Sequence, residues 1–390
     1  MNKQRIVTYG QLSRMAALLF LLCLSSHADP LDSWTLRAQF GLFTGDNLFG
    51  VAERAGTTVA VGTIPGVIFY RTNSGGGWNW ATNGLNYEYL YGVAADNKQL
   101  IAVGSAAYPA ILVSSNGMDW KTVYTTGSGT PPLDSFRAVV CISNLTVVVG
   151  TVGRIAVSTN AINWTAVASG TVNDLKAVGY ANGLFMAGDA AGGVLLSTNG
   201  LSWSRKQTAT TAPINGITCA NNLWVAVGGS LSGNGFIETS TNGIDWTLRL
   251  SSVSFRTSVA FYGGMFVAPG NLGSIYSSRD AISWSSRTNL ASTHTLNSII
   301  GTDSTLLAVG YSAVIVQSAP LVTMQASGGS VPQFTIFGLT NRSYQINKLD
   351  SLNSSNWLPA ATLQLSNAAV NWVDTAATNS SAFYRAVLLP

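Results

Sequence analysis

The chain has 390 residues, of which only 9% are charged while 40 are glycine. So few charges leave little material for the solvent-facing sides of helices, and the length is enough for one large domain and one small domain. The 20 basic and 16 acidic residues give a net charge of +4 and are scattered, without the basic stripe that binding to a phosphate backbone requires, so no nucleic-acid partner is expected.

Residues 1–28 have the pattern of a secretory signal peptide. Basic residues precede an apolar run from Ala16 to Leu24, and Ser26 and Ala28 place small residues at the minus-three and minus-one positions of a cleavage site. The apolar run falls short of the ~20 residues that cross a bilayer, so we expect cleavage near Ala28 and no transmembrane anchor. The mature protein is therefore predicted to be secreted, periplasmic or displayed on a bacterial cell surface.

An apolar tetrapeptide, usually ending in glycine, recurs through residues 29–319. Its copies lie about 41 residues apart, at Val59–Gly62, Ile101–Gly104, Val147–Gly150, Phe185–Gly188, Val225–Gly228, Phe266–Pro269 and Leu307–Gly310. A second phrase, Ser-x-Asn/Asp-Gly/Ala-x-x-Trp, follows at Ser114–Trp120, Ser158–Trp164, Ser197–Trp203, Ser240–Trp246 and Ser278–Trp284, with a degraded copy at Thr72–Trp78. This period is typical of β-propeller blades, each a four-stranded sheet around a common axis. The sequence predicts an all-β chain with a seven-bladed propeller at 29–319.

Each part of the second phrase has a mechanical role within a blade. Asn-Gly between two short strands favours a type I′ hairpin, in which both turn residues have positive φ. The preceding Ser or Thr is expected to hydrogen-bond the turn backbone. The Trp begins the outer strand, and we expect it to pack between adjacent sheets rather than to stack on a sugar.

The two ends of the repeat array complement each other. The seventh unit has the strand Val314–Val316 but continues to Pro320 without a Trp. The segment Asp32–Arg37 matches Ile244–Arg249 and has no blade of its own before it. We therefore predict that this N-terminal strand is the outer strand of the seventh blade, which closes the ring and removes an open sheet edge.

Residues 320–390 form a separate small module. Apolar residues alternate in short runs at Phe334–Gly338, Tyr344–Ile346 and Phe383–Ala386, separated by polar turn residues. Such spacing is typical of a small β-sandwich.

These motifs resemble the bacterial BNR/Asp-box repeat proteins of the sialidase-like propeller superfamily, including relatives of the photosystem II stability/assembly factor. The resemblance covers about residues 32–318 and implies the fold more than an activity. The Asp-box itself reads Ser-x-Asp-x-Gly-x-x-Trp, whereas this repeat is one residue shorter and mostly carries Asn. Residues after Leu321, with Trp357, Asp374 and Tyr384, resemble the fibronectin-like modules that end many bacterial secreted proteins.

The sequence offers little material for catalysis. After residue 28 the only glutamates are Glu53, Glu88 and Glu238, and the only histidine is His294, so metal sites and triads based on histidine have almost no candidates. Three aspartates, Asp119, Asp245 and Asp280, occupy hairpin turns, where we expect them to form the turn. No motif for a metal or cofactor occurs, and none is expected.

Two cysteines, Cys141 and Cys219, remain after residue 28. They occupy equivalent places in the third and fifth blades, and a disulfide needs Cα atoms within about 7 Å. A whole blade between them makes that distance too long. We therefore expect buried free thiols.

One position in each innermost strand stands out as a candidate ligand site. It follows a bulky apolar residue and precedes a small one, and it varies between blades: Phe49, Tyr91, Arg137, Lys176, Asn215, Arg256 and Asn297. If it faces a mouth of the central channel, three cations, two amides and two aromatics form a ring able to hold an anionic or polar group. The alternative is that these residues are solvated strand starts.

The leading functional hypothesis is a monomeric, non-enzymatic binding or scaffold protein that recognises a protein or glycan through its blade loops and channel mouth. The rival is a glycan-processing enzyme, sialidase-like or another hydrolase or lyase, with an atypical acid set such as Glu53, Glu88 and Asp189. The rival predicts two carboxyl groups within about 5 to 10 Å in one pocket. A further possibility is that the C-terminal module attaches the chain to a surface.

Overall fold

The structure is a computed structural model that describes residues 7–8, 30–40, 46–63, 68–72, 77–81, 89–105, 109–125, 135–231, 233–287, 291–302, 305–327, 332–338, 342–349, 357–366, 369–375 and 382–389. It divides into two compact units. The larger unit comprises Trp34–Ile300 and Leu307–Gln317, and the smaller comprises Met1–Ser33, Gly301–Leu306 and Ser318–Pro390. None of the helices that the structure describes has the length and apolar content needed to span a bilayer.

Six antiparallel sheets use four strands that are consecutive in sequence. Their bounds are β3 (Leu48–Arg54), β4 (Thr57–Gly62), β5 (Ile68–Thr72) and β6 (Asn79–Trp80); β7 (Tyr89–Ala95), β8 (Leu100–Ser105), β9 (Pro109–Ser114) and β10 (Lys121–Thr125); β11 (Phe136–Ile142), β12 (Leu145–Gly150), β13 (Ile155–Ser158) and β14 (Thr165–Val167); β15 (Leu175–Ala181), β16 (Leu184–Asp189), β17 (Gly193–Ser197) and β18 (Ser204–Gln207); β19 (Ile214–Ala220), β20 (Leu223–Gly228), β21 (Gly235–Ser240) and β22 (Thr247–Val253); and β23 (Ala260–Tyr262), β24 (Met265–Pro269), β25 (Ile275–Ser278) and β26 (Ser285–Arg287).

A further four-stranded sheet joins the start of the array to its end. Its order is β2-β29-β28-β27, with β2 at Trp34–Gln39, β27 at Leu296–Thr302, β28 at Thr305–Gly310 and β29 at Val314–Ser318. The Arg37 Nε donates a hydrogen bond to Gln317 Oε1 at 2.8 Å. The N-terminal segment therefore supplies the outer strand beside β29.

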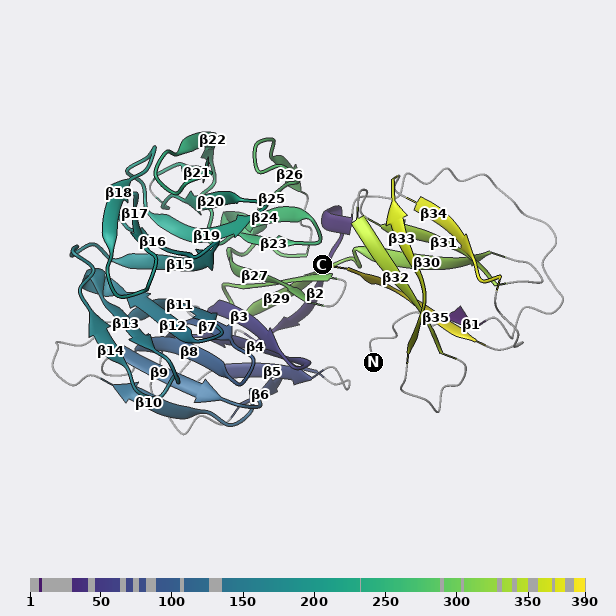
Figure 1. The fold of residues 1–390 in the computed structure, drawn as a ribbon, viewed down its shortest axis with the longest axis horizontal. Helices are drawn as coiled ribbons and strands as arrows, with labels where there is room; N and C mark the ends of the chain where they lie inside the picture. Colours follow the sequence, from purple (N-terminus) through teal and green to yellow (C-terminus); the bar gives the residue numbers. More distant parts are fainter. Residues whose placement is uncertain are drawn as a thin grey trace. The chain divides into compact units, whose positions relative to one another are not determined.

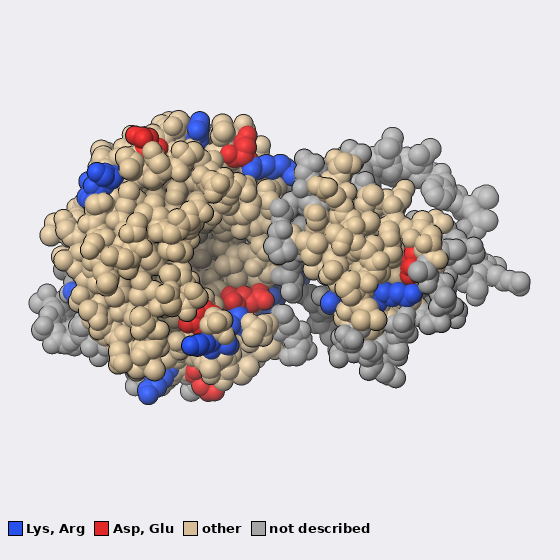
Figure 2. Space-filling view, in the orientation of Figure 1, with Lys and Arg blue, Asp and Glu red and all other residues tan. Residues whose placement is uncertain are grey.

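In the six sheets of consecutive strands the first strand lies toward the middle of the larger unit and the fourth lies at its rim (Figure 1). Neighbouring first strands contact one another in the order β3, β7, β11, β15, β19 and β23. The Asn297 Nδ2 on β27 donates to the Leu48 carbonyl on β3 at 2.8 Å. The view in Figure 2 shows a surface mostly free of charged side chains, with a hollow near the middle of the larger unit.

The repeated glycine lies at the end of the second strand, where a side chain has no room. A Cβ added at Gly62, Gly104 or Gly150 would overlap the backbone oxygen of Asn47, Tyr89 or Ser135, at the start of the facing inner strand. Only glycine allows this close approach of two backbones. In these three sheets the glycine thus fixes the register between the first two strands, whereas Asp189 takes the same place opposite Leu175 in the sheet that begins with β15.

The predicted type I′ hairpin is wrong. Only the Gly or Ala of each phrase has positive φ, as in Gly117 at 78° and Ala161 at 55°, whereas the preceding Asn does not. The Asn116 Oδ1 instead accepts the backbone N–H groups of Met118 and Asp119, at 2.8 and 3.0 Å. This side-chain acceptor replaces the backbone hydrogen bond of a tight hairpin and leaves Asn in an ordinary conformation.

The predicted packing role of the repeated tryptophans is confirmed. Trp120 is buried between two sheets, in one apolar cluster with Val59 on β4 and Leu100 on β8. Its Nε1 donates to the Gly117 carbonyl at 3.0 Å, so the polar atom is satisfied within its own turn. Tryptophans at the same place in other sheets pack in the corresponding clusters: Trp164, Trp203, Trp246 and Trp284.

The smaller unit contains two sheets that share one apolar core. One sheet has the order β30-β31-β34 and the other β1-β35-β32-β33, with bounds β1 (Val7–Thr8), β30 (Val322–Ser327), β31 (Gln333–Gly338), β32 (Arg342–Leu349), β33 (Leu358–Leu365), β34 (Ala369–Val373) and β35 (Phe383–Leu388). Phe334 and Ile336 from the first sheet pack with Tyr344 and Tyr384 from the second. The Tyr384 hydroxyl donates to Asp374 Oδ2 at 2.6 Å. Of the predicted signal peptide only Val7–Thr8 lies among the described residues.

Candidate functional site

A pocket of about 630 Å³ lies where the inner strands of the larger unit begin. Each of the seven four-stranded sheets described for this unit contributes one residue from the start of its inner strand or, in the sheet that begins with β23, from the segment just before that strand: Phe49, Tyr91, Arg137, Lys176, Asn215, Thr257 and Asn297. We call this cavity the mouth pocket. It brings together six of the seven residues proposed from the sequence.

The seventh proposed residue, Arg256, does not belong to the mouth pocket. Its side chain is 0% exposed, and its guanidinium donates to the Ser254 carbonyl at 2.9 Å and to the Ala268 and Ser274 carbonyls at 3.3 Å each. The guanidinium carbon lies 4.9 Å from the centre of the Tyr276 ring. Burial lowers the pKa of Arg256 to about 10. Its role is structural.

The error is a shift of one residue. Phe255 is bulky and apolar, so the sequence pattern takes it as the first strand position. In the structure Arg256 faces Gly270 across the strand pair, as Ile214 faces Gly228 in the preceding sheet. Thr257 therefore occupies the variable position. The following Ser258-Val259, a small residue and then a β-branched one, is the sequence signal that gives this register.

One side of the mouth pocket is aromatic and cationic. The Phe49 and Tyr91 rings lie 5.5 Å apart, and the Tyr311 ring meets Phe49 edge-on at 6.4 Å. The Arg137 guanidinium carbon lies 3.9 Å from the centre of the Tyr91 ring, a cation–π contact between two sheets. Lys176 follows on the next inner strand.

The other side of the mouth pocket is polar, but its groups are engaged by the backbone. The Asn215 Nδ2 donates to the carbonyls of Gly229 and Arg256, at 3.0 and 2.9 Å. The Thr257 hydroxyl donates to the carbonyls of Pro269 and Leu296, and Asn297 donates to Leu48. These side chains tie neighbouring sheets together, which leaves few free donors for a ligand on this side.

The charges that line the mouth pocket are Arg137, Lys176 and Asp174. Loss of water around the ammonium lowers the pKa of Lys176, the positive charge of Arg137 lowers it further, and Asp174 opposes the change. The Asp174 Oδ1 accepts the Val152 backbone N–H at 2.9 Å. Neither cation forms an ion pair with any of the residues that the structure describes.

Loops beside the mouth pocket expose apolar side chains. Leu231 and Tyr311 line the pocket and are 79% and 38% exposed. Val152 and Leu272 lie on the corresponding loops of two other sheets, at 55% and 71% exposed, and both adopt positive φ, 53° and 54°. A non-glycine residue in this conformation is strained, and strain of this kind occurs at recognition sites. The sequence pattern did not indicate these residues, because single apolar side chains in loops have no periodicity.

The chain matches no family model and no curated protein. Solved structures with low sequence identity have similar backbones. YCF48 bound to D1 peptide is 14% identical, with a TM-score of 0.56, over 76% of this chain and 99% of that one. The WD40 beta propeller domain of Doa1 is 12% identical, with a TM-score of 0.53, over 74% of this chain and 97% of that one. A catalytically inactive virginiamycin B lyase from Staphylococcus aureus with quinupristin is 12% identical, with a TM-score of 0.60, over 73% and 99%.

This chain has the β-propeller fold. The innermost strands of its sheets surround the mouth pocket, and concave mouths of this kind in β-structures are common ligand sites. The neighbours differ in what their names say they bind. The backbone similarity therefore establishes the propeller fold, whereas the function is inferred from the residues of the mouth pocket.

The acidic residues of the propeller do not form a paired catalytic site in the described residues. Asp174 is the single carboxylate that lines the mouth pocket. Glu53 lies at the other end of β3 and accepts a hydrogen bond from the Thr58 hydroxyl at 3.4 Å, and Glu88 lies outside the described residues. No group of three or more His, Cys, Asp or Glu in the described ranges is placed to hold a metal ion.

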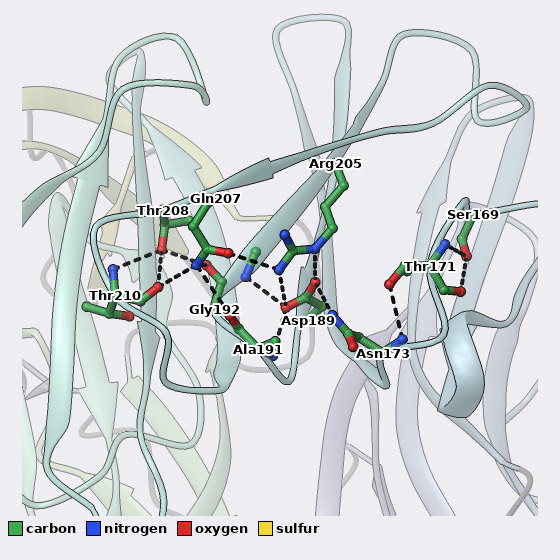
Figure 3. Close-up of polar contacts among 11 residues, drawn as sticks. Ser169, Thr171, Asn173, Asp189, Ala191, Gly192, Arg205, Gln207, Thr208 and Thr210 are labelled. Atoms are coloured by element: carbon green, nitrogen blue, oxygen red, sulfur yellow. Dashed lines mark hydrogen bonds and ion pairs between the residues drawn. The ribbon is translucent and has the colours of Figure 1, made fainter.

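Asp189 is a structural residue of the propeller (Figure 3). Its carboxylate accepts hydrogen bonds from Arg205 Nε at 2.6 Å, from Asn173 Nδ2 at 3.2 Å and from the backbone N–H groups of Ala191 and Gly193 at 2.8 and 2.7 Å. Burial favours the neutral form, but these donors together outweigh it and hold the pKa of Asp189 below its usual range. The Asp189 carboxylate holds the segments of Asn173, Ala191 and Arg205 together. With all these partners, it is not available as a catalytic acid.

Among the acids that the structure describes, Glu238 is the one whose pKa is raised, so its environment favours the neutral form. It is fully buried on β21, and only the Ala209 N–H, at 3.2 Å from Oε2, and Thr208 approach it, while Oε1 has no hydrogen-bond partner. Burial raises the pKa of Glu238 to about 7. It lies away from the residues that line the mouth pocket.

The two cysteines are free, as predicted. Cys141 faces Thr146 on the neighbouring strand, and Cys219 faces Trp224 at the equivalent place two sheets later. Both are half-buried rather than fully buried. Burial raises the pKa of Cys141 to about 12 and also raises that of Cys219, so neither thiol is activated as a nucleophile.

Proposed function

We propose that this chain is an exported, non-enzymatic binding protein that takes a segment of another protein into its mouth pocket. The observation that carries the proposal is a set of exposed apolar side chains on loops beside the mouth pocket: Val152, Leu231, Leu272 and Tyr311. One side of the pocket itself is lined by aromatic residues. Apolar and aromatic surface around a concave site is typical of protein interfaces. A glycan would need free hydrogen-bonding groups, and Asn215, Thr257 and Asn297 are engaged by the backbone.

The proposal includes a closed ring of seven blades, related to the BNR/Asp-box propellers, with β2 as the outer strand of the last blade. The position of β2 beside β29 and the hydrogen bond from Asn297 on β27 to Leu48 on β3 support it. A closed ring holds the loops around the pocket at fixed distances. The two sheets of the smaller unit fit a fibronectin-like module.

Export is proposed from the leader pattern in residues 1–28. The chain should be recovered outside the cytoplasm with a new N-terminus close to Asp29. Fractionation of the host followed by mass spectrometry of the N-terminal peptide tests this. Recovery of the protein in the cytoplasm with its first 28 residues intact would overturn it.

The binding proposal is tested by screening the purified protein against a peptide library and a glycan array side by side. The expected result is peptide binding that weakens at least about tenfold in Tyr91→Ala and Leu231→Ser. The matched control is Leu201→Ser, which changes an equally apolar, exposed residue of an outer turn. Binding of glycans alone, or peptide binding that these pocket variants leave unchanged, would overturn the proposal.

A further inference from the structure

We propose that the mouth pocket recognises a carboxylate that lies a few bonds from an aromatic ring, with the carboxylate between Arg137 and Lys176 and the ring against Phe49 and Tyr91. This inference rests on the mouth pocket being the binding site. It adds the chemistry of the group that the pocket takes.

The cations supply the first argument. Arg137 and Lys176 lie on adjacent inner strands and line the same cavity, close enough for the charge of Arg137 to act on Lys176. Two like charges in a cavity partly shielded from water repel each other. A bound anion turns that repulsion into two attractions. Because neither cation has an ion-pair partner in the described part of the chain, both charges are available for it.

The geometry of Arg137 selects a carboxylate. Its guanidinium lies against the Tyr91 ring with the carbon 3.9 Å from the ring centre. A guanidinium over a ring is held in place, and its N–H groups, which lie in the guanidinium plane, can still donate to a ligand. That plane matches the two oxygens of a carboxylate.

The aromatic residues supply the second argument. The Phe49 ring lies 5.5 Å from the Tyr91 ring and 6.4 Å from the Tyr311 ring by ring centres, so the three rings form an apolar wall next to the cations. A ring placed on this wall would meet aromatic faces and edges, which favour another aromatic group. The opposite side, with Asn215 and Asn297 engaged by the backbone, offers no comparable attraction. We therefore expect the ligand to place both its negative charge and its aromatic ring against this one side of the mouth pocket.

Asp174 lies in the same pocket and works against the anion. Its negative charge acts on Lys176 in the direction opposite to that of Arg137, and one of its oxygens is held by the Val152 N–H. A bound carboxylate must compete with it. Asp174→Asn should therefore strengthen binding while the cation variants weaken it.

Calorimetry on the full chain tests the inference with three probes: 3-phenylpropionate, its uncharged amide and acetate. We expect phenylpropionate to bind at least about tenfold more strongly than either comparison, because each lacks one of the two interactions. Arg137→Gln and Lys176→Gln should each weaken phenylpropionate binding by about tenfold. Lys206→Gln, which removes an exposed charge from the outer strand of the same sheet as Lys176, is the matched control and should change nothing.

Two peptides distinguish the source of the carboxylate. One ends in Phe with a free carboxyl terminus, and the other carries internal Asp-Phe with an amidated end. Binding of either peptide that depends on Arg137 supports the inference and names the source.

Equal binding of phenylpropionate and its amide would overturn the inference. If library peptides without this chemistry still depend on Tyr91 and Leu231, the chemical assignment is wrong and the proposed function stands. If no peptide depends on them, both are wrong. Circular dichroism of each variant establishes that it is folded.

Discussion

The guanidinium carbon of Arg256 lies 4.9 Å from the centre of the Tyr276 ring, and the Arg256 side chain is fully buried. Arg256 also donates to the Ser254, Ala268 and Ser274 carbonyls. Arg256→Met would leave these carbonyls without donors, which should cost about 3 kcal/mol of stability. Denaturant unfolding measures the change. Arg249→Met, which removes one hydrogen bond to Thr239 from a half-buried arginine, should cost less than about 1 kcal/mol.

Arg256→Met and Arg137→Gln together separate effects on structure from effects on binding. Arg256→Met should lower stability and leave peptide affinity intact in the folded fraction, whereas Arg137→Gln should lower affinity and leave stability intact. A loss of affinity in folded Arg256→Met would place Arg256 at the binding site after all.

The turn residue Asn242 should contribute to stability through its side-chain oxygen. It accepts the Ile244 and Asp245 N–H groups at 2.8 and 2.9 Å. Asn242→Ala leaves both donors to water and should lower the free energy of unfolding by about 1 kcal/mol. Thr241→Ala in the same turn is the control, since this side chain is exposed and should change little. Equal effects of the two variants in thermal unfolding would contradict the role given to Asn242.

Glu238 should make stability depend on pH. Its folded pKa of about 7 lies above the ordinary value of 4.5, so the folded protein holds this proton more tightly than the unfolded chain does. Stability from this group is present below pH 4.5 and is lost as the pH rises to about 7, by about 3 kcal/mol in total. Glu238→Gln removes that loss. Calorimetric unfolding should show that the stability of the variant relative to the natural protein increases between pH 4.5 and 8. A difference in stability that stays constant with pH would refute this.

The N-terminal strand should be essential for stability. Deleting residues 29–37 leaves β29 without its outer neighbour and exposes Val314–Val316, so the melting temperature should fall by several degrees. Arg37→Met, which removes only the contact to Gln317, should change it far less. A synthetic peptide of residues 30–40 added to the truncated protein should restore the melting temperature by pairing with the free edge. An unchanged melting temperature after deletion would rule out this role for β2.

The repeats allowed much of the fold to be predicted from the sequence. The glycine of each tetrapeptide contacts the neighbouring strand, and the tryptophan of each turn packs against the neighbouring sheet. Because each sheet needs both contacts, the two residue types recur once per sheet along the sequence. The candidate site was predicted less well. Arg256 was misplaced because Phe255 imitates the apolar residue that opens the other inner strands. Asp189 was considered only as a candidate catalytic acid. Its structural role was not predicted, because its partners Asn173, in a loop, and Arg205, on β18, each lie 16 residues away and meet it only in the folded chain.

The hydrogen bond between Arg37 and Gln317 joins positions 280 residues apart. During synthesis Arg37 leaves the ribosome long before Gln317 is made. The β2 segment therefore stays unpaired until almost all of the repeats have been synthesised. Contacts of such long sequence separation form slowly. Before they form, β29 has an open edge that could pair with another chain, which is the interval when a chaperone would be of most use to this protein.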